Sequence, residues 1–274
     1  MPYRHAHYYV GFVLLVILTG FWASYFAPIG SVPLAFHVHA VTAMTWLGFL
    51  IVQHVSIHRR MNALHRQVGL ASFALFPLLI VGLTMIINFS ADRLAANEGE
   101  FIAYAGPSFA IGMVIAIVAY LTLFYLALKN RRNVKLHAGY MLATPLILFE
   151  SPFSRVMGDY LPWMNVIGSE GPQAIFDTIA ISDTLATIFA LALYFRDRKN
   201  GAPWLVASAF MMTQAVVMWV TPGSAAVREI FRAYAAVPDA VTLSVAALLG
   251  LAACWFGWKA APSRPRRPEM PAAA

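Results

Sequence analysis

Histidines and arginines gather in two short segments of the chain that share one pattern. Residues 59–65 and 131–137 both follow Arg-Arg-x-x-x-Leu-His, and each ends on a histidine, His65 or His137, before a long apolar run. An imidazole nitrogen can bind haem iron, and guanidinium groups bind carboxylates and phosphates. The pattern therefore indicates a place where a cofactor or an anionic group could be held.

Two more histidines lie just before the first of these segments, four residues apart, so that on a helix they stack on one face. The resulting basic cluster contains His54, His58, His65, His137, Arg59, Arg60, Arg131 and Arg132. If it holds haem b, we expect His54 and His137 as axial ligands, with His65 as a substitute, and arginines at the propionates. The same cations would equally suit the phosphates of anionic lipids.

Carboxylates form a second candidate cluster. Glu150 and Asp183 lie within apolar runs, where a charged group is costly and usually functional, so they could handle protons or ions, with Arg155 nearby. Together with His37 and His39 they also offer the nitrogen and oxygen ligands of a divalent-metal site. That site requires the stretch around His37 to be extended, because residues two apart on a helix point to different faces.

The elements that must position these residues are eight apolar runs. The chain is 60% hydrophobic and 11% charged, whereas a soluble domain carries about a quarter charged residues. We therefore predict an all-α, polytopic membrane bundle of about eight transmembrane helices, each paired within its own backbone. The predicted spans are 8–27, 34–57, 68–88, 106–128, 136–157, 173–195, 203–220 and 237–258.

The loops between these runs alternate in charge. Fifteen of the nineteen Lys and Arg residues fall in the N-terminal segment, in every second loop or after the last run. The positive-inside rule then predicts both termini on the inner side of the membrane. Because the net charge of +7 comes from these loops, it does not indicate nucleic-acid binding. We expect one domain over 1–261 and a disordered basic tail over 262–274.

The order of several motifs resembles that of a family of uncharacterised bacterial polytopic membrane proteins. The motifs are His37-Val-His39-Ala40, Trp46, Gln53, Leu64-His65-Arg66-Gln67-Val68-Gly69 and Leu136-His137-Ala138-Gly139-Tyr140-Met141. This resemblance covers residues 8–200 and implies the topology and the choice of residues, with no activity attached. More distantly, the chain is similar to the transmembrane di-haem ascorbate reductases. Outer histidines occur here on one predicted helix alone, so at most one haem, on the inner side, is expected.

Three functions remain open from the sequence. The first is electron transfer by haem b at the basic cluster. The second is a proton- or ion-coupled transporter of small solutes that uses Glu150 and Asp183. The third is a non-catalytic membrane protein whose inner face binds lipid phosphate.

Overall fold

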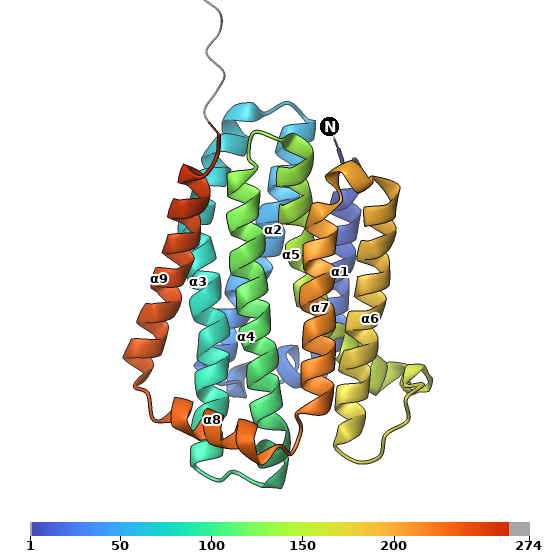
Figure 1. Ribbon diagram of the computed structural model, residues 1–274, viewed down its shortest axis with the longest axis vertical. Coiled ribbons are helices and arrows are strands. Elements are labelled where there is room, and N and C mark those ends of the chain that lie inside the picture. The colour runs from blue at the N-terminus through green and yellow to red at the C-terminus, as the bar shows by residue number, and fades with distance from the viewer. Residues whose placement is uncertain (1, 263–274) are drawn as a thin grey trace, which may run out of the picture.

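The computed structural model describes residues 2–262, and within this range the chain is helical with no strand. Eight helices lie side by side along the long axis of the molecule (Figure 1). They are α1 (Ala6–Gly20), α2 (Leu34–His58), α3 (Asn62–Ala95), α4 (Glu100–Lys129), α5 (Val134–Tyr160), α6 (Gln173–Arg196), α7 (Ala202–Val220) and α9 (Asp239–Lys259). The short helix α8 (Ala225–Ala235) lies across one end of the bundle.

Six of these helices, α2, α3, α4, α6, α7 and α9, are long and apolar enough to cross a membrane. This confirms the interpretation of the composition as that of a multi-pass membrane protein. Helix α5 is as long but more polar, and it packs against α1, α4, α6 and α7. Of its 27 residues 13 are buried, among them Thr144, Glu150 and Ser154, so part of its polarity faces other helices.

The connections divide the bundle into two distinct ends. One end, called here the basic end, carries loops 59–61, 130–133 and 197–201, the N-terminal residues 2–5 and the last turn of α9. It lies at the top of Figure 1. The opposite end carries residues 21–33, 96–99 and 161–172 together with α8. The two Arg-Arg-x-x-x-Leu-His segments therefore join α2 to α3 and α4 to α5 at the same end.

Several boundaries differ from the predicted ones for identifiable reasons. The run 8–27 is not one helix, because α1 ends at Gly20 and a π-helical turn, Trp22–Phe26, leads to prolines that cannot continue it. Helix α3 extends past the predicted span 68–88 at both ends, since its polar first and last turns also form a helix.

Helix α8 was not predicted. It is strongly amphipathic, and Ser224 caps it by accepting a hydrogen bond from the Val227 amide at 3.4 Å. Residues 263–274 of the predicted tail lie outside the described residues.

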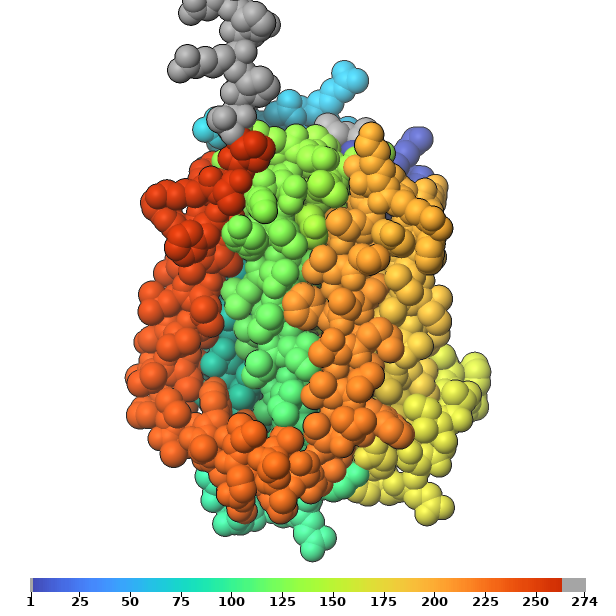
Figure 2. All heavy atoms as spheres, in the orientation of Figure 1, coloured from blue at the N-terminus to red at the C-terminus, as the bar shows by residue number. Residues whose placement is uncertain are grey.

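Close helix contacts are made where glycine removes a side chain. Gly20 of α1 lies against the backbone of Pro152 in α5, and Gly250 of α9 lies against Pro77 in α3. Small residues of this kind let membrane helices approach closely. Figure 2 shows the outcome on one face, where α9, α4 and α7 lie next to each other and α8 covers their lower end.

The centre of the bundle combines apolar packing with one polar link. Trp46 of α2 packs on Phe76 and Phe124, with ring centroids 5.6 and 5.5 Å away. Its indole N–H donates to the Thr144 hydroxyl at 2.9 Å. Since both side chains are buried, this bond fixes the height of α5, and with it Glu150, relative to α2.

Candidate functional site

The two carboxylates of the second candidate cluster lie together inside the bundle. Glu150 on α5 is 6% exposed and Asp183 on α6 is 1% exposed. The Ser182 hydroxyl donates to the backbone carbonyl of Glu150 at 3.2 Å, which places the following residue, Asp183, at the same height. The amide of Gln214 on α7 donates to Oε2 of Glu150 at 3.1 Å. Three neighbouring helices thus bring polar groups to one buried point.

This buried pair forms no salt bridge among residues 2–262, although Arg155 lies within electrostatic range of Glu150. The three ion pairs there all lie on the surface: Arg93–Glu98, Lys135–Asp197 and Arg232–Glu229. Oδ2 of Asp183 is buried with no hydrogen-bond partner in the described chain. Arg155, a possible partner of Glu150 from the sequence, instead donates to the carbonyl and the hydroxyl of Ser151 at 2.8 and 2.9 Å.

Such an arrangement has a direct consequence for protonation. Each buried, unpaired ion costs several kcal/mol, and two nearby like charges repel each other strongly where the dielectric constant is low. The Asp183 carboxyl lies within electrostatic range of Glu150. The pair is therefore most stable when it holds at least one proton, and it can exchange that proton without breaking an ion pair.

Two further buried polar side chains are those of Asp177 on α6 and Gln214 on α7, and sequence reasoning missed Gln214. Asp177 is fully buried and accepts hydrogen bonds from the amide and hydroxyl of Ser169 at 2.8 and 3.0 Å, and from the Trp219 indole at 2.9 Å. These three bonds make it a structural anchor between α6, α7 and the preceding loop. Gln214 could have been noticed as the one amide in the apolar run 203–220.

His65 and His137 have equivalent positions in their two hairpins. Nδ1 of His65 donates to the Gln53 carbonyl at 3.3 Å, and Nδ1 of His137 donates to the Ala127 carbonyl at 2.8 Å. Each histidine opens a helix and bonds to the last turns of the helix before it. The repeated segment thus closes two helical hairpins, and both rings keep Nε2 as an acceptor or ligand atom.

His54 and His58 form a separate group on α2. Their rings stack with centroids 4.1 Å apart, and His7 of α1 lies 5.0 Å from His54. Nε2 of His54 donates to the Arg4 carbonyl at 3.2 Å, and Nδ1 of His58 donates to the His54 carbonyl at 2.8 Å. These contacts hold His54 against the N-terminal segment. Its predicted pairing with His137 stays a prediction.

The four arginines of the basic cluster have different surroundings. Arg131 donates to the Trp258 carbonyl at 2.6 Å and lies over the Trp258 indole at 4.0 Å, linking α4 to α9. Desolvation, and then the charge of Arg132, lower the pKa of Arg131 from its ordinary value. Arg59, Arg60 and Arg132 are exposed at the basic end. These three, and not Arg131, are placed to meet anionic groups.

The fold does not assemble the predicted metal set of His37, His39, Glu150 and Asp183. Helix α2 begins at Leu34, so His37 and His39 are helical and point to different faces, and the condition of an extended stretch is not met. The His37 ring bonds to the Tyr25 hydroxyl at 3.0 Å. Over residues 2–262, no three His, Cys, Asp or Glu side chains gather in a way that could hold a metal ion.

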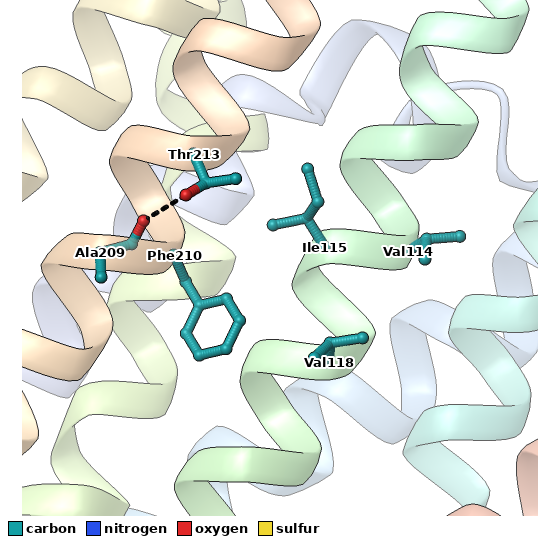
Figure 3. A pocket seen from close by; sticks show the side chains of 6 residues that line it. All are labelled: Val114, Ile115, Val118, Ala209, Phe210 and Thr213. Carbon is teal, nitrogen blue, oxygen red and sulfur yellow. Dashed lines mark hydrogen bonds between the residues drawn. The ribbon is translucent and has the colours of Figure 1, made fainter. Parts of the chain in front are cut away.

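A groove on the outside of the bundle lies apart from these polar groups. It runs between α4 and α7, has a volume of about 250 Å³ and is shown in Figure 3. Its lining residues are Val114, Ile115, Val118, Ala209, Phe210 and Thr213. The Thr213 hydroxyl already donates to the Ala209 carbonyl at 2.8 Å. The groove is apolar and offers no reactive group.

Comparison of the chain with family models, with curated proteins and with solved structures found no match. The resemblance to an uncharacterised membrane-protein family stays a prediction. Function is therefore argued from the site itself.

Proposed function

We propose that this protein crosses a bacterial inner membrane with eight helices, α1 to α7 and α9, and that both termini lie on the inner side. The gathering of basic loops at one end of the bundle supports this orientation. The place of α5 among four other helices supports counting it as a span despite its polarity. Amphipathic α8 suits the interface at the opposite surface.

Within this bundle, we propose that Glu150 and Asp183 bind and release protons, in coupling to the passage of a small solute or ion. One observation carries the proposal: two buried carboxyl groups lie at the same height on the neighbouring helices α5 and α6, and neither forms a salt bridge within the described chain. Ionisable groups kept inside a membrane bundle are costly, and proton relays are a frequent reason for keeping them.

The hydrogen bond from Gln214 suggests how the two carboxyl groups divide their roles. Its amide N–H donates to Glu150 and so favours an ionised Glu150. Asp183 has an unpartnered oxygen and no such donor, which favours the proton on Asp183. A solute that disturbs the Gln214 contact would shift the proton between the two groups, and this is a minimal form of coupling.

Proton flux in vesicles tests this function. Purified protein is placed in liposomes with an internal pH-sensitive dye, and a pH gradient is imposed. We expect Asp183→Asn and Glu150→Gln to reduce the flux to that of protein-free vesicles. Asp159→Asn changes an exposed carboxylate on the same helix as Glu150 and is the matched control. Wild-type flux in both of the first two variants would refute the proposal.

A second candidate is a haem b site at the basic end. The Nδ1 bonds of His65 and His137 to backbone carbonyls favour it, because metal-binding histidines are commonly oriented in this way. Arg59, Arg60 and Arg132 would then meet the propionates. An absorption spectrum and an iron analysis of purified protein test it, and the absence of both a Soret band and iron would refute it.

A third candidate requires no cofactor. The same exposed arginines would bind the headgroups of anionic lipids at the inner surface. Thermal stability in micelles with added anionic lipid, compared with a zwitterionic lipid, tests this. We expect a selective gain for the anionic lipid that disappears when Arg59, Arg60 and Arg132 are replaced by Gln, and equal gains would contradict it.

A further inference from the structure

Several buried polar atoms in the interior of the bundle have no hydrogen-bond partner within residues 2–262. Besides Oδ2 of Asp183, they include the hydroxyl oxygens of Tyr9, Tyr120, Thr187 and Ser208. They come from four different helices, α1, α4, α6 and α7. Orphaned polar groups are few in native proteins, and each indicates a bound water, an ion or a function.

The register of α7 against α5 gives the depth of Ser208. Gln214 contacts Glu150, and a side chain at Gly139 would touch Pro203, so the two helices run in parallel with a constant offset. Ser208 precedes Gln214 by six residues, which is about 9 Å at 1.5 Å per residue. Its hydroxyl therefore lies nearer the basic end than the carboxyl pair does.

The register of α6 places Thr187 at a depth between that of Ser208 and that of the carboxyl pair. Thr187 follows Asp183 by four residues, which is one helical turn toward the basic end and on the same face. The ring of Tyr9 stacks on Phe189 of α6, with centroids 5.7 Å apart, so Tyr9 lies about half a turn nearer the basic end than Thr187 and against another face of α6. Tyr120 precedes Lys129, the last residue of α4 at the basic end, by nine residues, which is about 14 Å.

The basic end supplies one more hydroxyl in the same direction. The Tyr3 hydroxyl would lie 3.1 Å from a Cβ at Gly139, beside Pro203. Tyr3 is only partly buried. Hydroxyl groups on α1, α4, α6 and α7 thus lie at successive depths between the basic end and Asp183.

We propose that water molecules bridge these hydroxyls into a hydrogen-bonded track that carries protons between the Glu150–Asp183 pair and the basic end. The inference rests on the proposed proton-binding function and adds that protons reach and leave the pair from the basic end. In each transfer a hydroxyl accepts a proton on an oxygen lone pair and releases its own to the next oxygen. One O–H bond forms as one breaks, and no net charge stays on the hydroxyls.

Hydration of the track can be measured without any transport. In radiolytic labelling, hydroxyl radicals made from water oxidise only side chains that touch water. We expect Tyr120 in the intact protein to be labelled several-fold faster than Phe76 and Phe124, which are equally buried aromatic side chains in the apolar core. Tyr9 is partly exposed and should also be labelled. Equal, slow rates for Tyr120, Phe76 and Phe124 would overturn the proposal.

The route is tested by hydrogen–deuterium exchange of the protonated carboxyl group, followed by its infrared C=O stretching band. We expect Thr187→Val and Ser208→Ala to slow the exchange several-fold. Thr184→Val removes an exposed hydroxyl on the same helix, which bonds to its own backbone at 2.7 Å, and should exchange like wild type. Unchanged exchange in the first two variants would overturn the track.

The two proposals can fail separately in these experiments. Labelled tyrosines and track-dependent exchange, with no proton flux in vesicles, would refute the transport function and keep the track. The opposite outcome is proton flux that depends on Asp183, with slow labelling of Tyr120 and unchanged carboxyl exchange in Thr187→Val. It would refute the track and leave the proposed function standing.

Discussion

The contact between Gly20 and Pro152 gives the sharpest test of how α1 packs on α5, two residues from Glu150. A Cβ at position 20 would overlap the Pro152 carbonyl oxygen and would lie 2.8 Å from the carbonyl carbon and 3.0 Å from the Cα of Pro152. Ordinary contacts begin at 3.4 Å. The opposing atoms belong to the backbone and cannot rotate away, so the Gly20→Ala variant must move α1 outward.

The size of the effect follows from this distance. Relief of the carbonyl-carbon contact alone requires a shift of about 0.6 Å, and gaps of about 0.5–1 Å forfeit a quarter to a half of the dispersion energy of each contact. Overpacking of this kind costs about 1–3 kcal/mol. Gly11→Ala on the same helix has nothing within 4 Å of the new Cβ and should gain about 0.5–1 kcal/mol of helix stability.

Unfolding in mixed micelles, followed by circular dichroism as the fraction of denaturing detergent rises, measures both variants. We expect Gly20→Ala to unfold earlier than wild type and Gly11→Ala to unfold at the same point or later. If Gly20→Ala proved as stable as Gly11→Ala, the close docking of α1 on α5 would be wrong.

Three further predictions follow from individual side chains. Asp177→Ala should lower the free energy of unfolding by about 3 kcal/mol or more, because charged hydrogen bonds contribute about 1.5–3 kcal/mol each, and unchanged Trp219 fluorescence with unchanged stability would contradict this. Lys135, by its hydrogen bond, lowers the pKa of Asp197, so the stability from this carboxylate is present above about pH 4 and is lost as the pH falls through the lowered pKa. Unfolding measured against pH should therefore lose part of its acid dependence in Asp197→Asn, and an unaltered profile would count against the pair. Thr187→Val should cost about 0.5–1.5 kcal/mol if water bonds to the hydroxyl, whereas a gain in stability would indicate a dry, unpaired group.

Much of the fold could be predicted because the membrane imposes it. Apolar runs must form helices in lipid, and this covers α2, α3, α4, α6, α7 and α9. Helix α8 was missed because its eleven residues form one apolar face and one charged face and contain no continuous apolar run. The break after Gly20 was missed because apolar composition continues through the π-helical turn.

The candidate sites could be predicted only in part. The type of a residue shows that burying its side chain is energetically costly, but it does not show which residues the side chain contacts. Glu150 and Asp183 stood out as buried charges in apolar runs, and the fold brings them together. That Arg155 bonds to Ser151 instead depends on the local rotation of α5, which the two prolines of that helix make hard to predict from sequence. The hairpin-closing bond of His137 depends on the angle between α4 and α5, which no spacing rule contains.

The central claim is that the pair formed by Glu150 and Asp183 holds a proton inside the membrane. The infrared spectrum of the purified protein at neutral pH tests it most directly. We expect a C=O stretching band of a protonated carboxylic acid that is present in wild type and in Asp159→Asn and is lost in Asp183→Asn. A neutral-pH spectrum in which no such band depends on Asp183 or Glu150 would contradict the claim.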